Sequence, residues 1–191
     1  MTTVWLLPVV TLIVASTSGG VLASALQKFN PSHALLTVAV SVVMVTIGLS
    51  LALMMLTFYL LRLIVFGLPP SATIISVFLP LGPTGQAGYS ILLIGQYFKS
   101  ALPLSSGSSE FLRGTTAGEM INVLCICVAY VLWSLASMWF LFAILGIGSV
   151  VRKTRIPFKV PFWGLIFPNV GVAYMAPYYH ANRICRGSTR I

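Results

Sequence analysis

Long runs of apolar residues separated by short polar linkers make up most of the chain. A helix that crosses a bilayer needs about 20 predominantly apolar residues, and these runs reach or approach that length. They lack the strict alternation of apolar and polar positions that marks the strands of a membrane barrel, so the spans are predicted to be helical. We place five predicted spans at about residues 4–26, 34–66, 68–98, 120–150 and 162–178.

The third predicted span, residues 68–98, carries no charged side chain, yet its apolar pattern is interrupted. The interrupting residues are Pro80, Gly82, Pro83, Gly85 and Gly88. Proline removes a backbone donor and frees a carbonyl one turn earlier, and such groups need partners inside protein or in a water-filled cavity. Broken helices of this kind often line substrate pathways. The alternative is a proline-kinked packing helix, because glycine and proline are common in membrane helices.

Proline, glycine and hydroxyl residues also occur in the first and fifth spans, whereas the second and fourth have few polar residues and no internal proline. The first span contains the stretch 15–20, Ala-Ser-Thr-Ser-Gly-Gly, at mid-depth. Serine and threonine there either face a pathway or bond back to their own helix. An inner ring of odd-numbered helices surrounded by an outer, lipid-facing ring of even-numbered helices explains the alternation.

Composition agrees with a membrane protein and narrows its partners. Hydrophobic residues form 58% of the chain and charged residues 7%, with a mean hydropathy of +1.01. The net charge of +9 arises because 11 Lys and Arg face only two acids, Glu110 and Glu119. Both acids lie in a linker, so no span carries a proton-relay carboxylate. An interior without acids suits an anion, and we expect no nucleic-acid partner.

Basic residues gather in the loop 151–161 and in the tail 181–191, which is too polar to span. The positive-inside rule places the loop in the cytoplasm, and membrane lipid headgroups are an alternative partner for it. Residues 1–180 contain all five predicted spans and are interpreted as one partial membrane domain. No nucleotide-binding loop, catalytic triad or paired carboxylates are present, so we expect neither an enzyme nor a cofactor. The cysteines and histidines lack ligand spacing, so no metal site is expected.

Four motifs resemble the tellurite-resistance/dicarboxylate transporter family, which includes plant slow anion channels and fungal malate permeases. The likeness is closest to the branch of fungal sulfite exporters. The motifs are Trp5-Leu6-Leu7-Pro8 with Ser16-Thr17-Ser18-Gly19-Gly20; Leu68-Pro69-Pro70; Ile75-Ser76-Val77-Phe78-Leu79-Pro80-Leu81-Gly82-Pro83 with Gly85-Gln86 and Gly88; and Phe162-Trp163-Gly164-Leu165-Ile166-Phe167-Pro168.

This resemblance implies an all-α integral membrane fold of ten helices, arranged as five hairpins around a central pore lined by the odd-numbered helices. The present chain is similar to the C-terminal half, roughly helices five to nine, and is therefore expected to be a partial version of that fold. A phenylalanine on the ninth helix closes the family's pore, and Phe167 is the matching choice, with Phe162 as the alternative. The resemblance also implies a homotrimer in the plasma membrane.

The leading hypothesis is anion transport, specifically sulfite efflux across the plasma membrane. The alternatives are transport of malate or another dicarboxylate by the same fold, and a truncated membrane fragment that transports nothing. Phe167 is the expected gate, since a ring beside a proline kink can block a narrow pore sterically and by dewetting. The expected pore-lining residues are Ser16, Ser18, Ser76, Pro80, Pro83, Thr84, Gln86 and Pro168.

Overall fold

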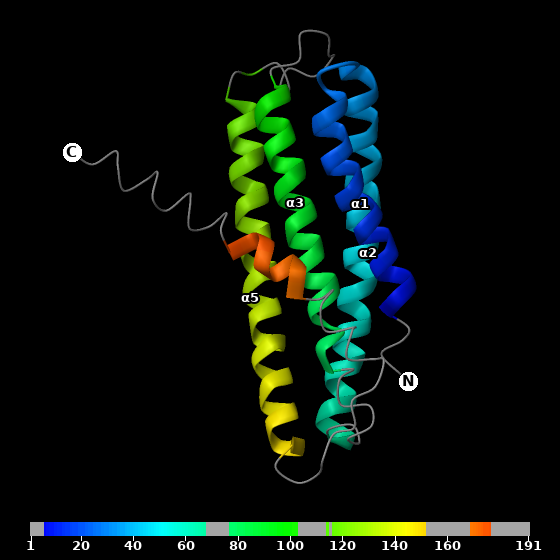
Figure 1. Ribbon diagram of the computed structural model, residues 1–191, viewed down its shortest axis with the longest axis vertical. Coiled ribbons are helices and arrows are strands. Elements are labelled where there is room, and N and C mark those ends of the chain that lie inside the picture. Colours follow the sequence, from blue (N-terminus) through cyan, green and yellow to red (C-terminus); the bar gives the residue numbers. More distant parts are fainter. Residues whose placement is uncertain (1–5, 68–76, 103–113, 115, 152–168, 177–191) are drawn as a thin grey trace, which may run out of the picture.

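The computed structural model describes residues 6–67, 77–102, 114, 116–151 and 169–176, and this part of the chain is helical apart from short turns. Four long helices run side by side along the length of the molecule (Figure 1). They are α1 (Leu7–Leu26), α2 (Pro31–Phe66), α3 (Leu81–Ala101) and α5 (Ala117–Val151). Residues 169–176 form a short helix, here called the crossing helix, which runs across the bundle at about half its height (Figure 1).

Short connections fix the neighbours in the bundle. Only residues 27–30 separate α1 from α2, so the two helices form an antiparallel hairpin. Pro31 occupies the first turn of α2, where its missing N–H has no intrahelical partner in any case. Helix α3 packs against α5, α1 and α2. It therefore lies at the centre of the described bundle.

Three helical segments are long and apolar enough to cross a membrane: Pro8–Leu26, Pro31–Phe66 and Ala117–Ser149. The prediction of an all-helical membrane protein is confirmed. Helix α3 has 21 residues and a length of about 31 Å, close to the bilayer core. Its glycines and its Thr, Ser and Gln residues lower its mean hydropathy, so it is not among the three candidate membrane spans. The total of five spans stays a prediction.

The interruption predicted in residues 68–98 is a helix start. Residues 77–80 form a tight turn, α3 begins at Leu81, and the helix then continues without a break to Ala101. Pro83 falls in the first turn, where a proline costs no hydrogen bond. Gly85 and Gly88 were expected to help break the span, but they lie inside a regular helix. Residues 68–76 are outside the described part of the chain.

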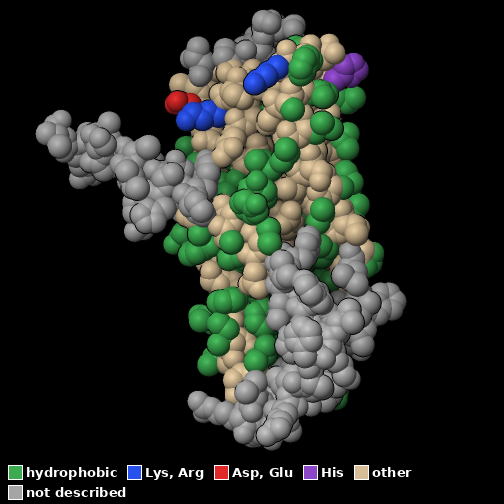
Figure 2. Space-filling view, in the orientation of Figure 1, with side chains coloured by type: hydrophobic (Ala, Val, Ile, Leu, Met, Phe, Trp, Pro, Cys, Tyr) green, Lys and Arg blue, Asp and Glu red, His purple; other side chains and the backbone are tan. Residues whose placement is uncertain are grey.

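Helix α3 differs from α2 and α5 in the side chains that it exposes, as the contrast between the third span and the even spans predicted. Helices α2 and α5 carry nearly all of the exposed large apolar side chains, whereas α3 has none in that class. Hydrophobic side chains are spread among backbone and other side chains over the coloured part of the visible face, while the visible Lys, Glu and His side chains lie at one end (Figure 2). This distribution fits outer helices that face lipid and an inner α3.

Two apolar clusters hold α3 in place. At the start of α3, the fully buried Leu81 packs in a cluster with four other buried residues. These are Leu6, which precedes α1, Leu56 and Tyr59 of α2, and Trp139 of α5. Farther along, a second cluster joins the middle of α1 and α2 to α3 and α5; its members include Ile13, Val38, Ala87, Ile94 and Leu132. Because lipid is as apolar as these side chains, close packing rather than exclusion from water stabilises such contacts.

Candidate functional site

The crossing helix contacts α3 at a point where each helix has a glycine, Gly171 and Gly85. A β-carbon on Gly171 would lie 2.9 Å from the backbone N of Gln86 and 2.9 Å from the carbonyl carbon of Gly85. A β-carbon on Gly85 would lie 2.9 Å from Cγ2 of Val172 and 3.1 Å from its backbone N. Real β-carbons essentially never come this close, so the two backbones can cross here only because neither residue has a side chain.

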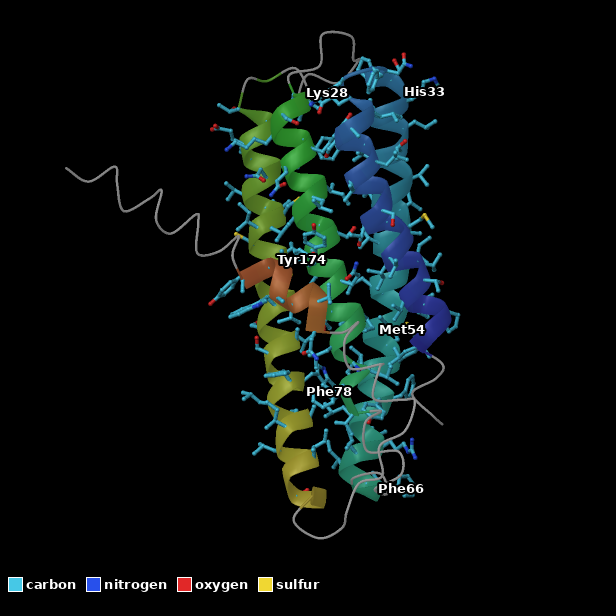
Figure 3. The ribbon with its side chains drawn as sticks, viewed as in Figure 1. Lys28, His33, Met54, Phe66, Phe78 and Tyr174 are labelled. Atoms are coloured by element: carbon cyan, nitrogen blue, oxygen red, sulfur yellow. The ribbon has the colours of Figure 1, made fainter. Side chains whose placement is uncertain are left out.

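Farther along the crossing helix, two side chains complete the docking. Met175 is fully buried and packs with Leu92 of α3 and Ala129 of α5. Tyr174 is mostly exposed and stacks on Tyr89 of α3, with ring centroids 5.4 Å apart and an interplanar angle of 23°. Figure 3 labels Tyr174 on this helix, midway along the bundle. The crossing helix is therefore held against the half of α3 that contains Gln86.

Gln86 lies where α1, α3 and the crossing helix meet. Its Nε2 donates a hydrogen bond of 3.3 Å to Oγ1 of Thr17 on α1. Its Oε1 lies 3.1 Å from the position that a β-carbon on Gly171 would occupy. Within the described residues, the second N–H of this amide has no hydrogen-bond partner. Gln86 itself is half-buried.

Ser16, another expected pathway residue, is fully buried in the contact between α1, α2 and α3. Its hydroxyl donates a hydrogen bond of 2.7 Å to the backbone O of Ser41. Its oxygen also lies 2.8 Å from Oγ of Ser90. Because the Ser16 proton is used by Ser41, Ser90 must be the donor to Ser16. In the described part of the chain, these hydroxyls join three helices.

Three more hydroxyls bond back to carbonyl groups of their own helix. Thr17 donates to Ile13 O at 3.0 Å, Ser18 to Val14 O at 3.2 Å, and the buried Thr84 to the Pro80 and Leu81 carbonyls, both at 3.2 Å. Such back-bonding satisfies a hydroxyl inside an apolar environment. Among the expected hydrogen-bonding residues that the structure describes, Gln86 alone keeps an unused donor.

The remaining expected site residues fall into two groups. Pro80 and Pro83 are buried at the start of α3, where they terminate the preceding turn and begin the helix. Ser76, Phe167 and Pro168 lie outside the described residues, so their roles stay predictions. Phe167 precedes the crossing helix by two positions in the sequence.

Sequence reasoning overlooked two residues of these interhelical contacts, Ser41 and Gly171. Ser41 belongs to a span interpreted as lipid-facing, yet it is buried and accepts the bond from Ser16. The signal was present as a repeat of small or narrow residues every third or fourth position, Ala34, Val38, Ser41, Val45, Gly48 and Ala52, all of them buried. Gly171 gave no signal, because only its contact with α3 distinguishes it from other glycines.

The charged side chains that the structure describes lie far from Gln86 and the contact between α1, α3 and the crossing helix. Lys28 lies in the turn between α1 and α2, Lys99 in the last turn of α3 and Glu119 in the first turn of α5. Arg62 lies near the other end, toward Phe66, and Figure 3 shows Lys28 and Phe66 at opposite ends of the bundle. Among the described residues, no group of His, Cys, Asp and Glu could hold a metal ion. In the described residues, the contact between α1, α3 and the crossing helix offers one unused neutral donor, the second N–H of Gln86.

The family model and the curated relatives that match this chain are all anion channels or anion transporters. Residues 1–184 match the family model described as voltage-dependent anion channel. The chain is 35% identical over 168 residues to a sulfite efflux pump of Arthroderma benhamiae, covering 88% of this chain and 42% of that protein. A sulfite efflux pump of Trichophyton rubrum is 34% identical over the same shares. One from Candida albicans is 30% identical, over 85% of this chain and 34% of that protein.

The chain thus spans less than half the length of the curated relatives it matches. No solved structure matches it.

Proposed function

This chain belongs to the voltage-dependent anion channel family, and we propose from that premise that it takes part in moving a small anion across a membrane. Sulfite is the proposed substrate and efflux the proposed direction, because the relatives that match the chain are named as sulfite efflux pumps. We further propose the plasma membrane as its location. The anion would pass along the side of α3 that faces α1 and the crossing helix.

Gln86 carries this proposal. It is a neutral amide at mid-bundle with one N–H bound to Thr17 and the other unused in the described structure. A hydrogen bond to a charged group is stronger than one between neutral groups. One such donor favours an anion over water without holding it as tightly as a fixed positive charge. Conduction needs that balance, because a site must release the ion as well as bind it.

The position of the charges favours a small inorganic anion over a dicarboxylate. A second carboxylate buried at mid-depth would need its own partner, because an isolated charge in an apolar medium is very costly. The Lys and Arg residues that the structure describes all lie near helix ends, so none can supply that partner. This supports sulfite, which presents its charge on one compact group, over malate.

Three further assignments rest on the sequence and the family. We propose Phe167 as the gate and Ser76 and Pro168 as neighbours of the same pathway. We propose a homotrimer surrounded by lipid, in which the apolar faces of α2 and α5 contact acyl chains or neighbouring subunits. The basic loop 151–161 would then lie at the cytoplasmic headgroups.

A sulfite-sensitive yeast strain provides the direct experiment. Expression of the full-length gene product is expected to raise sulfite tolerance and to accelerate the appearance of sulfite in the medium. The Gln86→Ala variant is expected to lose most of that gain while reaching the membrane in equal amount. Parallel export assays with malate and chloride identify the substrate. Malate export without sulfite export would assign the protein to the dicarboxylate branch, and no export of any of these anions would reject a transport role.

A further inference from the structure

We propose that Gly171 is a positioning residue for the anion-binding amide of Gln86: by lacking a side chain, it lets Gln86 turn an N–H rather than its carbonyl oxygen toward the anion. This inference rests on the proposed function, in which Gln86 donates to the anion. It adds a residue on a different helix whose role neither the family nor the relatives' names assign.

The orientation of the amide follows from Thr17. The Thr17 hydroxyl donates its only proton to Ile13 O at 3.0 Å. Its oxygen can then only accept from Gln86, so the nitrogen of the amide must face Thr17 and the 3.3 Å contact is an N–H···O bond. The carbonyl oxygen of the amide is thereby directed to the opposite side, where Gly171 lies.

Gly171 makes room for that oxygen. A β-carbon at this position would lie 3.1 Å from Oε1 of Gln86, and 2.9 Å from the backbone of both Gln86 and Gly85. Backbone atoms of α3 cannot yield as a flexible side chain can. Adding a methyl group therefore moves the crossing helix away from α3, turns the amide of Gln86, or does both. Either movement weakens the bond to Thr17 and presents the carbonyl oxygen to an incoming anion.

Gly88 supplies the matched comparison. It lies about one turn after Gly85, on the same face of α3. A β-carbon on Gly88 would lie 2.6 Å from Sδ and 2.7 Å from Cε of Met175. Those atoms are the far end of a flexible side chain, which adapts to irregular space. Gly88→Ala therefore disturbs the docking of the crossing helix without contacting Gln86. A loss that is specific to Gly171 separates amide positioning from docking in general.

The experiment is a double-mutant cycle in the full-length protein, reconstituted in phosphatidylcholine vesicles and assayed for sulfite flux over a range of concentrations. Gly171→Ala is expected to reduce flux at low sulfite about tenfold, the loss expected for one hydrogen bond to a charged group, mainly by raising KM. In the Gln86→Ala background the same substitution is expected to cause little further loss. Gly88→Ala is expected to give a smaller loss that is equal in both backgrounds.

Equal losses from Gly171→Ala in the two backgrounds would overturn the inference, since the glycine would then act on structure alone. If Gly171→Ala does not fold, Thr17→Val tests the same arrangement from α1, because it removes the acceptor and keeps the shape. Its loss should likewise vanish without Gln86, and a loss that persists there rejects the proposal. A Gln86→Ala variant that transports as well as the native protein would refute the proposed function itself, a separate result.

Discussion

The hydroxyl oxygens of Ser16 and Ser90 lie 2.8 Å apart in the buried contact between α1 and α3. The Ser16 hydroxyl donates a hydrogen bond to the Ser41 carbonyl of α2, so one side chain links three helices at mid-bundle. In the described structure no hydroxyl in this chain of bonds is left without a partner, because Ser41 in turn donates to Thr37 O at 2.8 Å. Ser16 therefore contributes to the packing beside the candidate site.

Replacing either end of this link should destabilise the bundle modestly. Ser16→Ala removes the bond to the Ser41 carbonyl and the bond to the Ser90 hydroxyl. We expect a loss of about 1 kcal/mol in unfolding free energy, within the range measured for hydrogen bonds between membrane helices. Ser90→Ala removes only one of the two bonds and should cost less. Denaturant titration in detergent micelles measures both values.

Ser18→Ala serves as the matched control for these two variants. Ser18 is on the same helix, but it is exposed and bonds only to its own backbone at Val14 O. Its removal should change the unfolding free energy by a few tenths of a kcal/mol at most. A loss from Ser18→Ala equal to that from Ser16→Ala would show that the interhelical bonds are not what stabilises this region.

Gly19→Ala should destabilise the hairpin of α1 and α2. A β-carbon at Gly19 would overlap the hydroxyl of Ser41, which is itself fixed by its bond to Thr37. Overpacking of this kind typically costs about 1–3 kcal/mol. Gly148→Ala is the control, because a β-carbon at that helical position meets no atom within 4 Å. It should be neutral or slightly stabilising, and thermal unfolding in detergent should rank the two variants in that order.

Met175→Ala should loosen the crossing helix. Its side chain is fully buried between α3 and α5, and truncating such a residue costs about 2–5 kcal/mol. The release is measurable as faster labelling of a cysteine introduced at the exposed Ala176. Met175→Leu, of similar volume, should keep the native labelling rate. Equal labelling rates in the Ala and Leu variants would contradict an anchoring role.

Phe167→Ala should increase anion conductance if this ring is the gate. Removing the ring widens a constriction and also relieves the dewetting that an apolar barrier causes. The measurement is anion current in cells expressing the full-length gene product. Phe162→Ala is the comparison, since the sequence leaves it as the alternative gate. An increase with Phe162→Ala but not with Phe167→Ala would transfer the role to Phe162.

The sequence by itself determined the class of protein and the approximate limits of α2 and α5. Apolar length and the scarcity of charge predict membrane helices whatever their neighbours, because the bilayer tolerates few other structures. The observed α2 and α5 begin within three residues of the predicted spans 34–66 and 120–150 and end within one. The same pattern correctly distinguished the apolar outer helices from α3. The family motifs pointed to anion transport before any contact was known.

Only the tertiary structure decided what the interruptions and hydroxyls do. Hydroxyl groups that look alike in sequence differ in partner: Ser16 reaches across to Ser41 and Ser90, while Ser18 bonds to its own helix. Gly85 and Gly171 are far apart in the chain, yet each matters because the other lies against it. Local sequence sets which conformations a segment can adopt, but the unused N–H of Gln86 results from the contacts that three helices make together.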